Sequence, residues 1–284
     1  MKTKSLFGII ASITSLILFQ DITQAQLPRE RVQIDEPVEN VFWATTNIGI
    51  STVRNLSASN LNTTIVHTFG PVNSGIDQFF GLDDGANTRI GIDYGISDRL
   101  SIGIGRMTFN KIVDIRGKYN FLRQSTNGNR PIDLAVKTSA GINTTSGIEL
   151  EFSDRLSFLL SAMAARKFNR FSLQLTPMFA HFNLVADGNP NRLFGLGILF
   201  NYELNDRFSV SSEYLPVIGK RNSGTRDALG VALNIDTGGH IFQLFFTSSQ
   251  WHGEQFIMAN NRDRFLEGDF RFGFNIYRVF GLGR

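Results

Sequence analysis

Charged residues of both signs stand at every second position of several segments, opposite an apolar face, so chemistry is most plausible on this polar face. Between residues 89 and 96, Arg89 and Asp93 share one face with glycines, and isoleucines occupy the other. If the polar face is enclosed, its charges either line a narrow water-filled passage or pair across strands and close the lumen. Because neither sign dominates, we expect no strong preference for anions or cations. The set comprises Arg89, Asp93, Asp114, Arg116, Lys118, Asp133, Lys137, Glu203, Glu213, Asp269 and Arg271.

The four histidines are candidates for metal ligands or for a catalytic base. The strand assignment below puts His67 and His181 near one end of the molecule, where they could meet at the rim. It puts His240 near the other end and His252 in a long loop. We keep His67 and His181 as a candidate rim pair and predict no metal site. The alternative is that each histidine is separately hydrogen-bonded at a membrane interface.

Nucleophilic catalysis has little support in the sequence. The chain contains no Gly-x-Ser-x-Gly segment, and Ser172 or Ser209 could pair with a histidine only by coincidence of register. Residues 83–87 offer oxygen ligands for calcium, but they lack the spacing and terminal acid of an EF-hand, so a solvated turn is expected. We predict no catalytic residue and no cofactor, with an embedded hydrolase as the least favoured alternative.

Composition excludes further classes of partner and site. The formal net charge is only +3 and no block of like charge occurs, which argues against a nucleic-acid partner. The absence of cysteine excludes a disulfide scaffold, a thiolate zinc site and a cysteine nucleophile. Stability must therefore come from packing and backbone hydrogen bonds.

The elements that would position these residues are β-strands, because apolar and polar or small residues alternate with period two along most of the chain. Short turns rich in Asp and Asn at 97–99, 167–171 and 205–207 alternate with longer joins at 70–87, 142–153, 185–192, 218–226 and 250–266. A brief join near 108–110 and a medium one near 123–130 are the exceptions. The predicted strands lie near 61–69, 88–97, 100–108, 111–122, 131–141, 154–167, 171–184, 193–204, 208–217, 227–236, 240–249 and 267–280.

This pattern predicts a single antiparallel transmembrane β-barrel of about 12 strands, with 8–14 possible. An even number of strands puts both termini on one side, with the tight turns there and the long loops on the other. Most strands are longer than the five or six residues typical of soluble sheets, and the face opposite the apolar one is Gly-rich. The alternative is a large soluble β-sandwich or a lipocalin-like barrel.

The N-terminus predicts export. Lys2 and Lys4 precede an apolar run at residues 6–19 and a small-residue cleavage site at 23–25, so we predict a signal peptide over 1–25, cleaved after Ala25. A membrane anchor is the alternative, although the apolar run is shorter than the roughly 20 residues that a spanning helix needs. Residues 26–60 would then form a periplasmic N-terminal arm or plug, and residues 61–284 the barrel in the cell outer membrane.

Several segments resemble a family of predicted outer-membrane β-barrel proteins from Bacteroidota, a domain family of unknown function. They include VHTFG at 66–70, FGLD at 80–83, NTRIG at 87–91, YGISDRL at 94–100, LRQ at 122–124, TGGHIFQL at 237–244 and GDFRFGFN at 268–275. Thr68 departs from the basic residue expected after the histidine. The resemblance implies the barrel and carries no activity with it.

These observations predict a narrow porin-like channel or a binding barrel for a small solute or lipid. The alternative is a non-conducting structural or surface-interaction barrel whose long loops 70–87 and 250–266 bind a partner. Outer-membrane lipid is an expected partner. Barrel-assembly machinery is another, because the last predicted strand alternates apolar residues and has Phe280 near its end.

Overall fold

The structure is a computed structural model that describes residues 35–147 and 149–282. The description below concerns the unit formed by residues 36–284. The predicted signal peptide, 1–25, lies outside the described residues.

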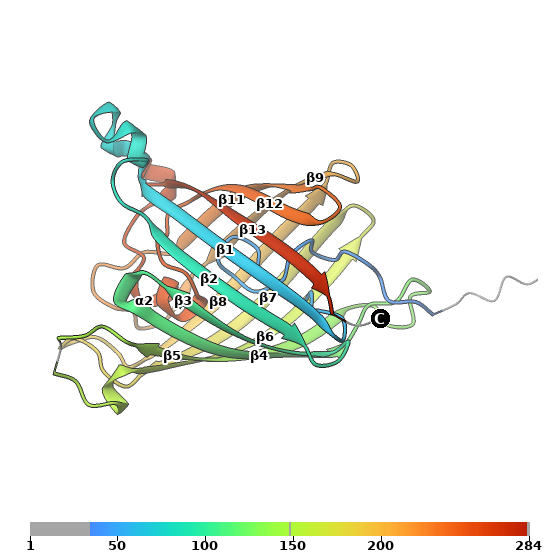
Figure 1. Cartoon of the computed structure of the whole chain (residues 1–284), viewed down its shortest axis with the longest axis horizontal. Coiled ribbons are helices and arrows are strands. Elements are labelled where there is room, and N and C mark those ends of the chain that lie inside the picture. Colours follow the sequence, from blue (N-terminus) through green and yellow to red (C-terminus); the bar gives the residue numbers. More distant parts are fainter. Residues whose placement is uncertain (1–34, 148, 283–284) are drawn as a thin grey trace, which may run out of the picture. The chain divides into compact units, whose positions relative to one another are not determined.

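Antiparallel strands form one sheet that closes on itself (Figure 1). Strands β9 and β10 are two pieces of one strand interrupted at Pro216, which has no N–H to donate to the ladder. Counting them as one, the barrel has twelve strands, as predicted. The strands are β1 (Asn60–Pro71), β2 (Asn87–Gly95), β3 (Leu100–Met107), β4 (Ile112–Leu122), β5 (Asp133–Asn143), β6 (Leu156–Phe168), β7 (Phe171–Phe182), β8 (Arg192–Glu203), β9 (Phe208–Leu215), β10 (Val217–Ile218), β11 (Ala228–Asp236), β12 (His240–Thr247) and β13 (Arg271–Gly281).

The first and last strands close the ring. Asn60 of β1 lies opposite Gly281 of β13, and Thr68 lies opposite Gly273. The start of β1 and the end of β13 therefore share one end of the barrel, together with the connections 96–99, 169–170, 204–207 and 237–239. We call this the turn end. The opposite, loop end carries the longer connections 72–86, 144–155, 183–191, 219–227 and 248–270.

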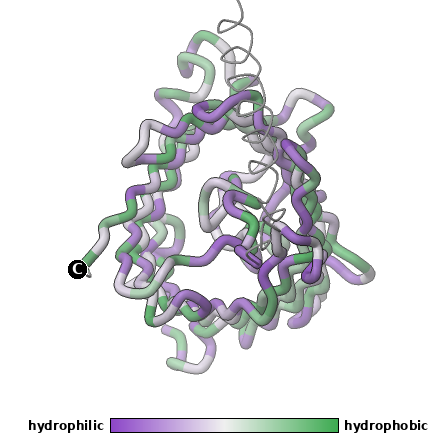
Figure 2. The backbone as a smooth tube through the Cα atoms, turned by 90° about the vertical axis from the view of Figure 1, so that its right-hand side faces the viewer, coloured by the Kyte–Doolittle hydropathy of each residue, from purple (hydrophilic) through white to green (hydrophobic). Residues whose placement is uncertain are grey.

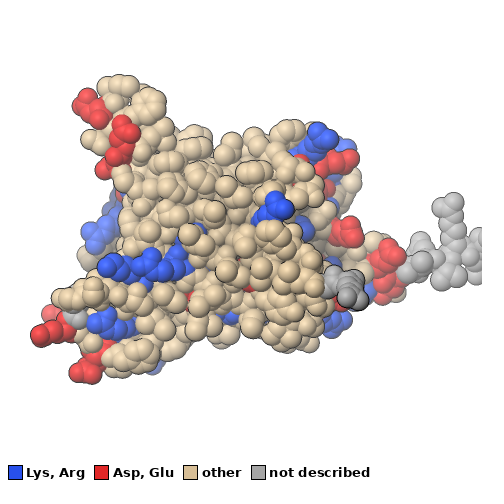
Figure 3. Space-filling model, viewed as in Figure 1, with Lys and Arg blue, Asp and Glu red and all other residues tan. Residues whose placement is uncertain are grey.

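The outer face of the barrel is apolar. Mid-strand residues such as Ile92, Ile104 and Ile115 are about half exposed on this face, whereas their neighbours along each strand point inward. Acidic side chains gather at the two ends of the molecule (Figure 3). Aromatic rings pair on the outer face toward both ends of the strands. Ring pairs include Phe69–Phe272 and Phe179–Phe194 at the loop end, and Tyr119–Phe121 and Phe168–Phe171 at the turn end. Two aromatic girdles around an apolar band are typical of a membrane-spanning barrel.

Helices are short and lie in the connections. They are the 3-10 turns η1 (Val72–Ser74), η2 (Ile76–Gly81), η3 (Phe109–Lys111), η4 (Ser153–Arg155) and η5 (Phe265–Glu267), and the α-helix α2 (Glu254–Asn260). Among the described residues, no helix has the length and hydropathy to cross a membrane.

The predicted strands agree with the observed ones except at the last. β13 begins at Arg271 rather than at 267, because residues 265–267 form the helical turn η5 and Gly268 follows with φ 93°. Gly adopts this left-handed conformation readily, and it ends the turn. Asp269, predicted on the inner face of that strand, consequently lies in the connection before it.

Two segments fill the barrel instead of leaving an open lumen. Figure 2, seen from the turn end, shows chain inside the ring of strands. We call residues 36–58 the plug segment and residues 248–262 the inner loop. Residues 250–262 of the inner loop fall within the join predicted to lie outside the barrel, but Glu254 and the next five residues of α2 are all buried. Four consecutive apolar residues, 256–259, explain why this part of the loop folds inward.

Candidate solute path inside the barrel

The plug segment is held mainly through its backbone. The carboxylate of Glu213, on β9, accepts hydrogen bonds from the backbone N–H groups of Ile48 at 3.1 Å, Gly49 at 2.8 Å and Ile50 at 3.1 Å. Successive N–H groups that point to one side form a concave site for an anion, and here the anion is the side chain itself. One inward carboxylate therefore fixes three consecutive plug residues.

Other inward side chains bind the plug segment from around the ring. Gln174 of β7 accepts from the N–H of Val53 and donates to the carbonyl of Ser51, both at 2.8 Å. Lys118 of β4 donates to the carbonyls of Thr45, Thr52 and Arg54, and Tyr277 of β13 donates to those of Thr46 and Asn47. These charged and amide side chains satisfy backbone groups that a lumen without water would otherwise leave unpaired.

The plug segment also packs against one wall of the barrel. Its residues Val41, Phe42, Ile50 and Val53 belong to an apolar cluster with inward residues from β5 to β11 and with α2. The wall contributes Ala135, Leu159, Met163, Ala165, Met178, Ala180, Leu193, Leu199, Leu215, Val217 and Ala228. The β5–β11 side therefore carries the main apolar cluster of the interior, with Lys137 and Glu213 as buried charges that bind the inserted segments.

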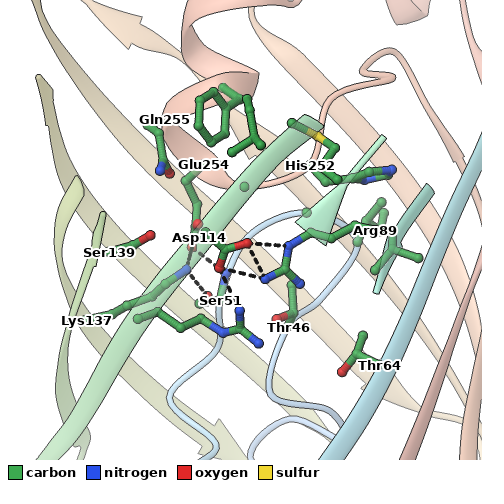
Figure 4. A pocket seen from close by; sticks show the side chains of 18 of the residues that line it. Thr46, Ser51, Thr64, Arg89, Asp114, Lys137, Ser139, His252, Glu254 and Gln255 are labelled. Atoms are coloured by element: carbon green, nitrogen blue, oxygen red, sulfur yellow. Dashed lines mark hydrogen bonds and ion pairs between the residues drawn. The ribbon is translucent and has the colours of Figure 1, made fainter. Parts of the chain in front are cut away.

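A buried ion pair joins the inner loop, the plug segment and the wall (Figure 4). Lys137 of β5 donates to Glu254 of α2 at 2.7 Å and to the hydroxyl of Ser51 at 2.7 Å. Glu254 also accepts from the backbone N–H of Ser51 at 3.0 Å. Burial raises the pKa of Glu254, but the charge of Lys137 outweighs it and holds that pKa below its ordinary value.

His252 anchors the start of the inner loop. Its Nε2 lies 3.0 Å from the carbonyl of Asn87, so this nitrogen carries the proton and donates it. The side chain of Asn87 in turn donates to the carbonyl of Gln250 at 2.8 Å. Burial lowers the pKa of His252 to about 4, so the ring is neutral near pH 7.

Opposite the apolar wall, arginines and aspartates form a network on β2 and β4. Arg89 makes a bidentate pair with Asp114, at 2.8 and 3.0 Å, and Arg116 bridges Asp93 and Asp114, each at 2.7 Å. Figure 4 shows the pair of Arg89 with Asp114 beneath the inner loop. Glycines make room for it: a Cβ on Gly105 would lie 2.6 Å from Cζ of Arg89 and 2.8 Å from Oδ2 of Asp114. The small residues of the inner face therefore leave the space that the charged side chains beside them occupy.

Four cavities follow one another from the loop end to the turn end, and the middle two lie against this charged wall. A vestibule of about 340 Å³ opens at the loop end, and a central cavity of about 50 Å³ lies between the inner loop and the plug segment. A lower cavity of about 30 Å³ and a turn-end cavity of about 240 Å³ continue the series. The first three are ordered along β4, since Ile112 lines the vestibule and the central cavity, and Lys118 the lower one. The lower and turn-end cavities share Thr45 and Leu56 of the plug segment.

Neighbouring cavities share residues that mark the constrictions between them. Phe256 of α2 lines both the vestibule and the central cavity. Ser51, Arg116 and Lys137 line both the central and the lower cavities. The central cavity has room for about three to five water molecules. Larger solutes cannot pass until a side chain or a segment moves.

The remaining predicted charges take separate positions. Glu203 accepts from Lys167 at 2.7 Å and from the indole of Trp43 at 3.1 Å, at the turn end. Asp133 is buried at the start of β5 and lines another turn-end cavity. At the loop end, Arg271 pairs with Asp263. Asp269, outside β13, accepts from Asn73 at 2.7 Å.

The structure separates the candidate rim pair. His67 accepts from or donates to Thr88 at 2.8 Å through Nδ1 and stacks on Phe274 of β13. His181, on β7, lies in register with Arg192 of β8. Strands β1 and β7 are on opposite sides of the ring, so each histidine has its own neighbours. Across the described residues, no group of three His, Cys, Asp or Glu is arranged to hold a metal ion.

The two serines considered for catalysis face the interior. Ser209 accepts from Asn234 at 3.0 Å, and Ser172 lies opposite Asn201 in the sheet. Among the described residues, no hydrogen bond joins either serine to a histidine.

Sequence reasoning missed several residues of this interior. Gln174 and Tyr277 bind the plug segment, and Glu254 and Ser51 join the two inserted segments to each other, yet none carries a motif. A usable signal is present in one case only: the apolar residues 256–259 follow Glu254 directly in a predicted loop.

The fold is similar to that of known outer-membrane channels. The NanC porin shares 8% sequence identity and a TM-score of 0.51, covering 76% of this chain and 98% of that one. An outer membrane channel from Pseudomonas putida F1 shares 11% identity and a TM-score of 0.50, covering 80% and 97%. Comparison with curated proteins finds no significant match. Residues 42–280 match a family described as "Membrane bound beta barrel domain (DUF5777)". This chain therefore belongs to the membrane bound beta barrel domain (DUF5777) family.

Proposed function

We propose that the protein is a gated porin-like channel of the outer membrane that admits a small polar solute, and that the structure is its closed state. The turn end would face the periplasm and the loop end the exterior, after removal of the leader following Ala25. The observation that carries the proposal is the series of cavities from the loop end to the turn end, interrupted where the inner loop and the plug segment meet the charged wall. The two fold neighbours, a porin and a channel, are in keeping with it.

The inner loop is the better candidate for the gate. Its helix α2 has seven residues, too few to be stable in water without packing. Its polar anchors to the wall include the pair of Lys137 with Glu254, the bond of His252 to Asn87, and hydrogen bonds from Asn222 and Asn261. Gln250 adds two more, as it accepts from Asn87 and donates to the carbonyl of Phe69. The plug segment is bound at more points around the ring, and both segments pack on the apolar wall. A solute would pass between the plug segment and the charged wall once α2 withdraws.

Two glycines on β8 allow each segment to be locked separately. A Cβ on Gly195 would lie 3.4 Å from Cγ of Met258 in α2, and one on Gly197 would lie 3.3 Å from Cγ2 of Ile50 in the plug segment. A cysteine sulfur at position 258 or 50 can occupy nearly the place of that carbon, within reach of an S–S bond of about 2.0 Å. The chain has no cysteine of its own, so each introduced pair is unambiguous.

The test is single-channel recording of the refolded chain in a planar bilayer, after heat-modifiable gel mobility has verified the barrel. We expect wild type to open in discrete steps, oxidised G195C/M258C to stay closed, and reduction to restore opening. Oxidised G197C/I50C should still open, and the four single-cysteine variants serve as controls. A folded barrel that never opens in wild type or in either reduced variant overturns the channel. Openings that persist in oxidised G195C/M258C overturn the assignment of the gate.

A second candidate function rests on the connection 72–86. Ile76, Phe79 and Phe80 are at least half exposed there, and both phenylalanines have positive φ, an uncommon conformation for bulky residues. An exposed apolar tip held in this way suits contact with a partner. Replacing all three residues by Ser should abolish such contact on intact cells while leaving conductance unchanged.

A further inference from the structure

The vestibule at the loop end has the size of a small-molecule site. Its volume of about 340 Å³ falls within the range of ligand pockets, roughly 300–1,000 Å³. Its lining comes from β4, β5, the connections 183–191 and 219–227, and α2, which forms part of its floor through Phe256, Ala259 and Asn260. Segments far apart in the sequence thus converge on one hollow above the inner loop.

Amide groups in this lining are only partly used. Asn222 donates to the carbonyl of Ala259 at 3.0 Å, while its own side-chain oxygen is buried with no hydrogen-bond partner. Asn189 accepts from the N–H of Ser223 at 3.0 Å, and among the described residues its NH₂ makes no hydrogen bond. A buried acceptor left unpaired is costly, so a ligand that donates there gains free energy. The vestibule therefore offers an acceptor and a donor together, the pair that a hydroxyl group satisfies.

The rest of the lining combines apolar residues with further amides, and carries two arginines against one aspartate. Phe182 and Phe256 meet edge to face with ring centroids 6.0 Å apart, beside Leu184. The arginines are Arg155, whose guanidinium donates to backbone carbonyls, and Arg262, and Asp154 opposes them. Rings and free amides without a dominant charge suit a ligand that has C–H faces and many hydroxyl groups.

We propose that the vestibule binds a neutral mono- or disaccharide on the outer face of α2. This assignment rests on the proposed channel, for which it names the class of solute. Because α2 forms part of the floor, the closed barrel already contains the site. Binding can therefore be measured without any opening of the channel.

Trp251 provides the signal. It packs against the cluster that contains Phe256, and Trp43 is the only other tryptophan. The W43F variant, refolded in an amine-oxide detergent rather than a sugar-based one, is titrated with glucose, galactose, maltose and lactose. Gluconate and the dipeptide Ala-Ala are the counter-probes. We expect a saturable change in Trp251 emission with at least one neutral sugar and none with the counter-probes.

The N189D substitution adds specificity to the test. It keeps the oxygen that accepts from Ser223 but replaces the free donor by an acceptor, so sugar binding should weaken about tenfold. N127D is the matched control at the turn end, where Asn127 likewise accepts from a backbone N–H, that of Asn129. It should leave binding unchanged.

Three results would overturn the saccharide site: no response to any sugar, a stronger response to gluconate or Ala-Ala, or equal weakening by both substitutions. The experiments distinguish failure of the proposed channel from failure of the saccharide site. Sugar binding by a barrel that never conducts removes the channel and leaves the site, whereas openings without sugar binding leave the channel and remove the site.

Discussion

Replacing Lys137 by Met leaves the carboxylate of Glu254, the first residue of α2, buried with no cation beside it. The two side chains are only 9% and 1% exposed, and their ionic contact is 2.7 Å long. Removing one partner of a buried pair costs roughly 3–5 kcal/mol, because the remaining charge keeps its desolvation penalty. Most of this cost disappears when α2 withdraws and Glu254 reaches water. The closed state should therefore lose about 3 kcal/mol relative to the open one.

A loss of about 3 kcal/mol multiplies the ratio of open to closed channels by roughly 100–200. Single-channel recordings of K137M should accordingly show a large rise in open probability. The double variant K137M/E254Q should return close to wild type, because the E254Q substitution removes the charge and its amide oxygen can still accept from the N–H of Ser51. If an unpaired buried charge opens the channel, open probability should be highest in K137M, lower in E254Q and lowest in K137M/E254Q. If K137M and K137M/E254Q open equally often, the pair does not hold the gate and the reasoning is wrong.

Three further predictions concern the loop, the network and the outer face. Since the folded pKa of His252, about 4, lies below its ordinary 6.5, its contribution to holding the inner loop is complete above pH 6.5 and is lost as pH falls toward 4. The protection factors of amides 250–260 against hydrogen exchange, which are corrected for the slower intrinsic exchange at low pH, should therefore fall over that range in wild type, and H252Q should remove this slope. Gly105→Ala should destabilise the folded barrel by about 1–3 kcal/mol and so lower the temperature of the heat-modifiable band shift. Gly117→Ala is the control, because its Cβ would meet its nearest atom only at 4.0 Å, and it should leave that temperature unchanged. Equal shifts in the two variants would exclude crowding of the network as the cause. Ile104→Arg on the outer face should lower the free energy of urea unfolding in lipid vesicles by about 2–4 kcal/mol. Leu266→Arg, at a side chain 89% exposed in a connection, should leave that free energy unchanged. No loss of stability with Ile104→Arg would mean that this face does not contact lipid.

The strands could be predicted because a barrel wall imposes one rule on every residue. Each strand has lipid on one side and the interior on the other, so its side chains alternate regardless of their partners, as at Ile102 and Ile104 with the glycines beside them. The rule fails where the chain leaves the wall. Residues 267–270 keep the alternation and are therefore predicted as strand, although η5 ends there and β13 starts only at Arg271.

The inner face is predictable as a set but not as an arrangement. Alternation alone places Arg89, Asp114 and Arg116 there, whereas their pairing depends on which strands are neighbours and in what register. The plug segment presents a different difficulty. Glu213 binds backbone N–H groups, which every residue but proline has, so the sequence of residues 48–50 contains no sign of its partner.

The contacts of Glu213 also constrain the order of assembly. Ile48 precedes its partner by 165 residues, and the partners of Asn47 on β13 are still more distant, at up to 230 residues. Contacts of such long sequence separation form late and slowly, since the loop they close must first be ordered. The plug segment is therefore synthesised before its partners and cannot bind inside the barrel until β9 and β13 have formed. During folding, the barrel accordingly passes through a stage in which the wall is nearly complete, the plug segment is not yet bound, and water fills its place.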